Sequence, residues 1–245
     1  MLQMRTAIIS DIHGNATAFK EVLKDIKKAA VDMTISLGDN IGYGPEPDEV
    51  IHLLNENHIP SVIGNHEMAI NRPRLQSWFN PIARTSLEKT ITLMSESSLR
   101  YIRNFNNCMV LNNLRFVHGF PPGSVTLYLF EMTEKQIIDV MTKMNEKICF
   151  IGHTHVQEII TFDGKTIFQK PLREGIIELD DENKYIINAG SVGQPRDGNA
   201  HAKYVIFDSL TNELTVRYIP YDVQDTIKKI YQVGLPEQHA LRLMK

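Results

Sequence analysis

Hydrophobic residues in the first quarter of the chain form short continuous runs that alternate with helical patterns. Three such runs are typical of buried strands, and they cover residues 6–10, 33–37 and 59–63. After the first run, apolar residues recur every three or four positions along one side of a predicted helix: Phe19, Val22, Leu23, Ile26 and Ala30. Residues 46–55 have the pattern of a second helix. This alternation predicts a parallel sheet covered by helices.

Later in the chain, strand-like runs dominate. They cover residues 108–111, 114–117, 147–151, 157–162, 166–169, 176–178, 185–187, 203–207 and 214–219. Asp163 and Gly164 form a hairpin turn signal between two of them. Helical patterns cover residues 81–104, 133–144 and 223–245. We therefore predict one α/β domain spanning residues 1–245, with two packed sheets, outer helices and a helical tail over about 222–245.

Composition and charge are those of an ordinary globular protein. Hydrophobic residues make up 42% of the chain and the net charge is -3, so no basic field suits a nucleic-acid backbone. No run approaches the roughly 18 apolar residues of a membrane span, and the first ten residues do not read as a signal peptide. We expect a cytoplasmic protein with no membrane partner. Cys108 and Cys149 lie in apolar stretches and are expected to be buried, reduced thiols.

Polar side chains with metal-binding chemistry follow five of the predicted strands. In open α/β sheets, ligands bind beyond the carboxyl ends of the strands, so these side chains are expected to meet there. Glycines precede three of them, where the backbone must approach a ligand closely. The candidate ligands are Asp11, His13, Asp39, Asn65, His118, His153 and His155.

The spacing and number of these residues favour two metal ions. Asp11 and His13 are separated by one residue, as are His153 and His155, so an extended backbone would turn each pair to one side. Carboxylate, imidazole and amide oxygen ligands suit Mn, Fe, Zn, Co or Ni. Seven ligands are too many for one tetrahedral zinc, whereas they suit two ions that share a bridging carboxylate.

The ordered motifs resemble those of the calcineurin-like metallophosphoesterase superfamily. They are Asp11-Ile-His13, Gly38-Asp39, Gly64-Asn65-His66-Glu67, Val117-His118-Gly119 and Gly152-His153-Thr-His155. The segment from Asn188 to Arg196 resembles the closing loop of the small prokaryotic phosphoesterases in that superfamily. Single motifs are weak signals, but the complete ordered set is strong.

The resemblance implies a four-layer α/β/β/α sandwich and a role for each residue. One metal would be held by the residues matching Asp11, His13 and His155, and the other by those matching Asn65, His118 and His153. The aspartate matching Asp39 would bridge the two divalent ions, for which Mn or Fe is favoured. The histidine matching His66 would lie near the leaving group.

One departure from the family pattern concerns the turn after Asp39. The superfamily's protein Ser/Thr phosphatases have a second aspartate that orients the general-acid histidine and an arginine that binds phosphate. This chain has Gly42 and Tyr43 at those positions. His66 therefore needs another orienting partner and the phosphate another cation, for which Arg196 is the candidate.

We expect the chain to hydrolyse a small phosphodiester or phosphomonoester. A hydroxide bound by the two metals would attack phosphorus in line, and His66 would protonate the departing oxygen. The alternatives are a dinucleoside polyphosphate hydrolase, a protein phosphatase, and a catalytically silent scaffold that binds protein partners. The natural substrate and the oligomeric state stay open.

Several other residues have structural interpretations. Glu67 is expected to stabilise the start of a helix. We assign His52 and His239 to the surface, and favour a role outside the site for His201. Trp78 and Phe79 either line a lid or pack in the core, and packing in the core is favoured.

Overall fold

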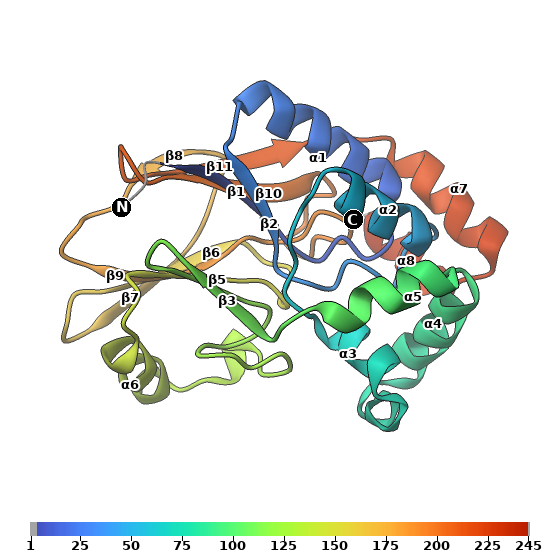
Figure 1. Cartoon of the computed structure of the whole chain (residues 1–245), viewed down its shortest axis with the longest axis horizontal. Helices are drawn as coiled ribbons and strands as arrows, with labels where there is room; N and C mark the ends of the chain where they lie inside the picture. Colours follow the sequence, from blue (N-terminus) through green and yellow to red (C-terminus); the bar gives the residue numbers. More distant parts are fainter. Residues whose placement is uncertain (1–3, 245) are drawn as a thin grey trace.

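The computed structural model describes residues 4–244 and contains two mixed sheets (Figure 1). The first has the strand order β2-β1-β10-β11-β8. Its parallel pair, β1 and β2, comes from the N-terminal alternation of strand and helix, and β10 then pairs antiparallel with β1. Its strands are β1 (Arg5–Ile9), β2 (Met33–Ser36), β8 (Gly175–Glu178), β10 (Ala202–Asp208) and β11 (Glu213–Ile219).

The second sheet has the order β3-β4-β5-β9-β6-β7. Its centre is parallel, because β4, β5 and β9 run in the same direction. The β6–β7 hairpin turns at Asp163, whose carboxylate accepts hydrogen bonds from the backbone of Lys165 and Thr166. The strands are β3 (Cys108–Leu111), β4 (Leu114–Val117), β5 (Ile148–Ile151), β6 (Glu158–Phe162), β7 (Ile167–Pro171) and β9 (Lys184–Asn188).

Helices cover the outer face of each sheet. The α-helices are α1 (Ala16–Ala29), α2 (Pro47–Glu56), α3 (Asn65–Asn71), α4 (Pro81–Thr92), α5 (Glu96–Tyr101), α6 (Glu134–Lys143), α7 (Val223–Val233) and α8 (Glu237–Leu243). Three short 3-10 helices accompany them: η1 (Pro73–Trp78), η2 (Ile102–Asn104) and η3 (Leu129–Glu131). Asn15 caps α1 by accepting a hydrogen bond from the backbone of Ala18, as its side-chain chemistry predicts.

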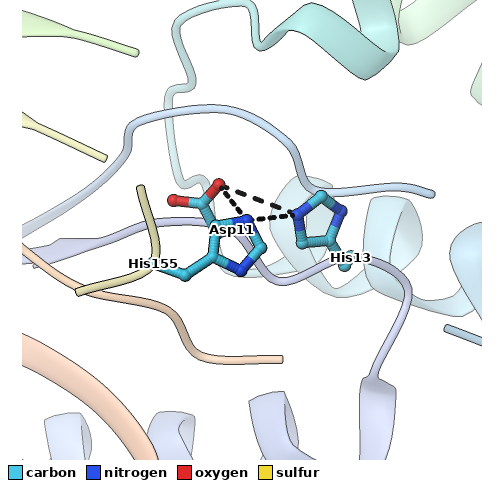
Figure 2. Close-up of side chains that lie close together, drawn as sticks. All are labelled: Asp11, His13 and His155. Atoms are coloured by element: carbon cyan, nitrogen blue, oxygen red, sulfur yellow. Dashed lines mark hydrogen bonds and ion pairs between the residues drawn. The ribbon is translucent and has the colours of Figure 1, made fainter. Parts of the chain in front are cut away.

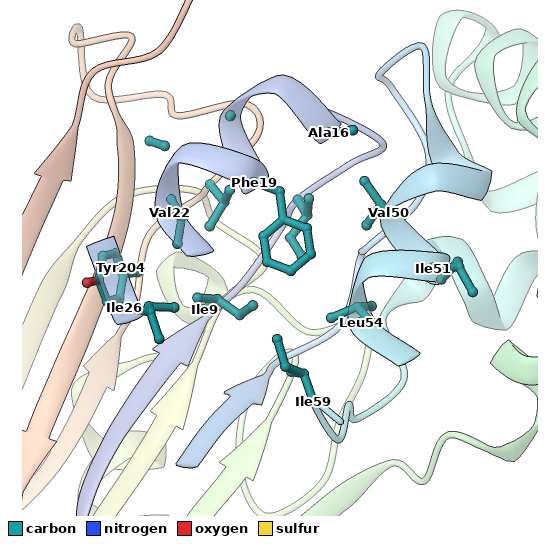
Figure 3. Packing of buried hydrophobic residues seen from close by; sticks show 14 of the residues in the cluster. Ile9, Ala16, Phe19, Val22, Ile26, Val50, Ile51, Leu54, Ile59 and Tyr204 are labelled. Atoms are coloured by element: carbon teal, nitrogen blue, oxygen red, sulfur yellow. The ribbon is translucent and has the colours of Figure 1, made fainter. Parts of the chain in front are cut away.

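Three hydrophobic clusters fill the spaces between four layers. The first joins α1 and α2 to one face of the first sheet, where Phe19 and Leu54 pack against Ile9 (Figure 3). The second lies between the sheets, and the third joins the second sheet to α6. Side chains of β1 alternate between the first two clusters, as the two-residue period of a strand requires. The predicted α/β/β/α sandwich is therefore confirmed.

Two segments differ from the elements that their patterns predict. Residues 59–63 do not form a regular strand. They pair with each neighbouring segment at one position only, through the isolated bridges Ser36–Ser61 and Val62–Asn106. Residues 81–104 are not one helix but α4, α5 and η2, and the side chain of Ser95 begins a new helix by capping α5.

Two further features concern helices and thiols. Among residues 4–244, no helix combines the length and the apolar character needed to cross a bilayer. Cys149 is buried and free, as predicted. Cys108 is also free but only half-buried, because the edge strand β3 has a neighbour on one side only.

Candidate metal centre

The seven candidate ligands meet beyond the carboxyl ends of the strands. β1 leads to Asp11 and β2 to Asp39, while β4 and β5 lead to His118 and His153. Asn65 follows the bridged segment 59–63 and is the first residue of α3. The predicted pattern of strand followed by polar side chain is thus present at four regular strands and one bridged segment.

The backbone at these residues is not extended. Asp11, His13, Asp39, His153 and His155 all have φ between 48° and 68°, in the left-handed region. The expectation that an extended chain aligns Asp11 with His13 and His153 with His155 is therefore wrong. Residues other than glycine rarely adopt this conformation and persist in it where their surroundings impose it, often at functional sites.

One group of donor atoms consists of Asp11, His13 and His155. Their ligand atoms point toward one another, and all three side chains are almost fully buried (Figure 2). The Nε2 atoms of the two histidines are 3.1 Å apart, and Asp11 Oδ1 is 3.3 Å from His155 Nε2 and 3.7 Å from His13 Nε2.

Backbone carbonyls determine which nitrogen of each ring carries the proton. Nδ1 of His13 donates to the carbonyl of Ile41, and Nδ1 of His155 donates to that of Gln194. In the neutral rings the protons are therefore on Nδ1, and the two facing Nε2 atoms present lone pairs to each other. Two lone pairs at 3.1 Å repel each other unless a cation lies beside them.

A second group is formed by Asp39, His118 and His153, with Asn65 beside it. His118 Nε2 lies 3.0 Å from His153 Nδ1, 3.1 Å from Asn65 Oδ1 and 3.4 Å from Asp39 Oδ2. Carbonyl groups again accept from the opposite ring nitrogens, that of Leu37 from His118 and that of Thr126 from His153. The nitrogens that face the cluster are thus lone-pair donors in the neutral rings.

Each carboxylate has one anchored oxygen and one oxygen directed into the clusters. Asp11 Oδ2 accepts from the Ser10 hydroxyl and from the backbone of His153, whereas its buried Oδ1 has no hydrogen-bond partner. Asp39 Oδ1 accepts from the backbone of His66, whereas Oδ2 lies 3.7 Å from His13 Nε2. An anchored carboxylate with one bare oxygen is an oriented metal ligand.

Burial sets the protonation of most of the histidines. It lowers the pKa of His13 and His155 well below the ordinary value and that of His153 to about 3. Burial also lowers the pKa of His118, but the Asp39 carboxylate beside it raises the value to about 9 overall. The imidazoles are thus largely in the neutral form that binds metals, while the carboxylates draw one positive charge into the clusters.

His66 is held by ring packing rather than by a hydrogen bond. Tyr43 and Phe79 contact its ring edge to face, at centroid distances of 4.6 Å and 5.0 Å, and Nδ1 has no hydrogen-bond partner among residues 4–244. A Cβ atom at Gly42 would lie 2.5 Å from that Nδ1, so the position where protein phosphatases have their orienting aspartate does face His66. Burial lowers the pKa of His66 to about 4, and its Nε2 lies 3.9 Å from Asp39 Oδ2.

Glu67 does more than begin a helix. Its carboxylate accepts from the backbone of Gly64, as predicted for a group near the start of α3. It also accepts from the backbone of Asp39 and Asn40, and so joins the two loops that carry Asp39 and Asn65. Burial raises its pKa to about 7. The helix-start interpretation was correct but left out this second role, which depends on contacts across the fold.

Aromatic residues surround a cavity of about 240 Å³ that opens beside Asn65 and His153. Tyr128 stacks on His153 at a centroid distance of 3.7 Å, which its sequence context did not indicate. Trp78 lines the cavity and is 68% exposed, so the favoured core-packing interpretation is wrong for it. Pro73 starts the short helix η1, which ends at Trp78 and keeps the indole on the rim.

His239 is a further correction, because it is buried rather than on the surface. Its ring stacks on Tyr43, and its nitrogens lie within hydrogen-bond distance of Ser86 and Gln194. The sequence contains no local signal for this position, which depends on how α8 packs. His52 is exposed, as predicted, and so is His201.

Arg196 lies next to the metal centre. Its backbone N–H donates to the carbonyl of His155, and its positive charge lowers the pKa of His155 and His13. The side chain is exposed and lines a cavity together with Arg242 of α8. Its predicted contact with phosphate stays a prediction.

The fold and the site agree with comparisons to known proteins. Residues 4–212 match the model of the calcineurin-like phosphoesterase superfamily domain. An uncharacterized protein of Methanocaldococcus jannaschii is 32% identical over 249 residues, covering 99% of this chain and 98% of the relative. A metallophosphoesterase structure from Sphaerobacter thermophilus has a TM-score of 0.85 at 34% identity, covering 99% of this chain and 98% of its own. Serine/threonine-protein phosphatase 2 of Escherichia coli is 29% identical over 146 residues, covering 54% of this chain and 65% of its own.

Proposed function

Because the chain belongs to the calcineurin-like phosphoesterase superfamily and is a metal-dependent phosphoesterase, we propose that it hydrolyses a small phosphodiester or phosphomonoester at a two-metal centre. One observation carries the proposal. Two groups of converging donor atoms lie on either side of Asp39, whose Oδ2 is 3.7 Å from His13 Nε2 in one group and 3.4 Å from His118 Nε2 in the other.

The donor set fits two divalent ions. Asp11, His13 and His155 would hold one ion, and Asn65, His118 and His153 the other, with Asp39 shared. The fit rests on the bare Asp11 Oδ1 and on the facing lone pairs of His13 and His155, which are costly to bury without a cation. The mixed nitrogen and oxygen ligands suit Mn, Fe, Zn, Ni or Co, with Mn or Fe favoured.

The side chains around the donor atoms would bind and orient the substrate. Two bound ions supply the Lewis acidity that binuclear hydrolases use on phosphoesters. In this proposal His66 would donate a proton from Nε2 to the departing oxygen, which is supported by the packing of its ring against Tyr43 and Phe79 and by its position 3.9 Å from Asp39 Oδ2. The negative charge of a bound phosphate favours the protonated ring.

Three rivals to a small-phosphoester hydrolase remain, and site observations argue against two of them. A protein phosphatase is disfavoured because Gly42 and Tyr43 replace the orienting aspartate and the phosphate-binding arginine, although one relative is a serine/threonine-protein phosphatase. A dinucleoside polyphosphate hydrolase is distinguished by experiment, through hydrolysis of a diadenosine polyphosphate in the comparison of substrates below. A catalytically silent scaffold would have no reason to keep six converging carboxylate and imidazole donors buried.

The test is hydrolysis by protein stripped of metal and then reloaded with single divalent ions. Bis-p-nitrophenyl phosphate, p-nitrophenyl phosphate, a diadenosine polyphosphate and a phosphopeptide are compared at equal concentrations. We expect two ions per chain by elemental analysis, and the greatest kcat/KM on the diester. A single ion per chain, or no hydrolysis with any metal, would contradict the proposal.

A further inference from the structure

A second cavity, of about 300 Å³, lies beside the metal centre and is lined by two arginines. Arg196 comes from the closing loop, and Arg242 comes from α8 at the far end of the chain. Gly198 and Asn199 form part of its wall. The backbone N–H of Arg196 is hydrogen-bonded to the carbonyl of His155, so the cavity adjoins the candidate metal ligands.

The charges of the two arginines are uncompensated. Among residues 4–244, neither guanidinium group makes an ion pair or a hydrogen bond, and the two face the same cavity. Partial burial lowers the pKa of Arg242, and the charge of Arg196 lowers it further. Two like charges that share a cavity cost free energy unless an anion joins them.

Asp197, the acidic residue next to Arg196 in the chain, does not neutralise the two arginines, because its carboxylate pairs with Lys203. Asp197 follows Arg196 directly, but its carboxylate accepts from Nζ of Lys203, at 2.5 Å, and Lys203 is fully buried. Lys203 also donates to the carbonyl of Asn199. The lysine thereby both anchors the closing loop and keeps the carboxylate away from Arg196.

Arg242 is held in place by the packing of α8. One turn earlier on the same helix, the ring of His239 stacks on Tyr43 and contacts Gln194 of the closing loop. The next residue after Arg242, Leu243, is buried against α7 residues such as Ile230. The helix therefore presents Arg242 to the cavity from a fixed base.

We propose that this cavity, the arginine pocket, binds a second phosphate group of the substrate, one that is not hydrolysed. The inference rests on the proposed function, because it places the scissile phosphate at the metal centre next door. Guanidinium groups bind phosphate oxygens through paired hydrogen bonds, and two of them match a dianion. The preferred substrates are thus phosphoesters with two separate anionic groups.

Calorimetry with inorganic phosphate tests the pocket without any turnover. Metal-loaded and metal-stripped wild-type protein are titrated beside Arg242→Gln and a matched control, Arg100→Gln, an exposed arginine of α5. We expect the metal-stripped wild type and control to keep one phosphate site, weakened at least tenfold in Arg242→Gln. Arg242→Lys, which keeps the charge but not the planar fork, should lie between. Equal phosphate affinity in the wild type and Arg242→Gln, with unchanged circular dichroism, would overturn the pocket.

Kinetics then distinguish a substrate phosphate from free phosphate as the occupant. The kcat/KM ratio of adenosine 3′,5′-bisphosphate to adenosine 5′-monophosphate is measured at fixed free metal concentration. We expect this ratio to fall at least tenfold in Arg242→Gln and to stay constant in Arg100→Gln. An unchanged ratio despite lost phosphate binding would mean that the pocket holds free phosphate, and would overturn the substrate assignment. Failure to hydrolyse any phosphoester would instead refute the proposed function, while the phosphate titration still decides the pocket.

Discussion

The metal centre and the arginine pocket lie side by side but are built in opposite ways. In the metal centre every candidate ligand follows a strand or bridged segment, and all except the half-buried Asn65 are buried and have a hydrogen-bond partner that orients them. In the arginine pocket both side chains are exposed, come from distant parts of the chain and have no acidic partner among residues 4–244. The first site is buried and held by hydrogen bonds, whereas the second is open and positive.

This difference reflects the cost of burying polar groups. A buried carboxylate or imidazole without a partner is costly, so a site that holds two carboxylates and four imidazoles must be organised in detail and is expected to be completed by cations. Exposed guanidinium groups stay partly solvated, so two of them that share a pocket cost less than unpaired groups in the buried centre. We infer that the metal centre governs catalysis, while the arginine pocket governs which substrates bind.

The largest expected effect comes from Asp39→Asn, which removes the one carboxylate shared by both donor groups. Both ions should bind more weakly, and kcat/KM should fall about a thousandfold, because the metals contribute several kcal/mol of transition-state stabilisation. Elemental analysis and steady-state kinetics measure this. The same chemical change in Asp25→Asn, outside the site, is the control. Two stoichiometric ions in Asp39→Asn would refute the bridging role.

His66→Asn separates proton transfer from metal binding within the same centre. Both ions should stay, and kcat/KM on an alkyl phosphoester should fall about a hundredfold, since an alkoxide needs a proton on departure. The loss on a p-nitrophenyl ester should be much smaller, because p-nitrophenolate is a weak base. Equal losses on both substrates would instead assign His66 to the phosphoryl group, and a lost ion would assign it to the coordination shell, in line with its 3.9 Å distance from Asp39.

Lys203→Met removes the lysine that pairs with Asp197, so that this carboxylate becomes available to the arginine pocket. Removing the buried partner of Asp197 should cost about 2 kcal/mol of unfolding free energy. The released carboxylate is then able to pair with Arg196, so phosphate affinity should fall roughly fivefold. Chemical denaturation and calorimetry measure the two effects. The double variant Lys203→Met/Asp197→Asn should recover phosphate affinity, and failure to do so would exclude competition by Asp197.

The smallest expected effect comes from breaking the ion pair of Arg217 with Asp25, since this arginine, unlike those of the arginine pocket, has an acidic partner. Asp25 accepts from Arg217 at 2.6 Å and from the hydroxyl of Tyr204 at 2.6 Å. Burial raises the pKa of Asp25, but these donors outweigh it and hold the pKa below its ordinary value. The carboxylate therefore stabilises the fold above about pH 4, and this contribution is lost as the pH falls.

Asp25→Asn should accordingly lower the unfolding free energy by about 1 kcal/mol at pH 7. The difference from wild type should shrink as the pH falls below about 4, where the wild-type carboxylate takes up a proton. Denaturant midpoints at pH 7 and pH 3 measure it. A difference that grows toward pH 3 would show that the ion pair is not its source.

The order of strands and of polar side chains after them was predictable from the sequence. Apolar runs of the right length and period predicted two packed sheets with outer helices, and the family resemblance implied the four-layer sandwich. Short apolar runs followed by polar side chains with metal-binding chemistry identified all seven residues that the structure brings together. These signals are local, because a few neighbouring residues contain both the apolar run that predicts the strand and the polar residue that follows it.

Other features were decided only by the tertiary structure. Residues 59–63 have the composition of a strand but too few neighbours to form one. Asp11 and His13 converge through left-handed backbone, which their one-residue spacing does not reveal. His239 is buried because α8 packs against the closing loop, and no residue near it in the sequence signals that contact. Each of these outcomes depends on which distant segments meet, and long-range packing is not encoded in the local periods from which strands and helices are predicted.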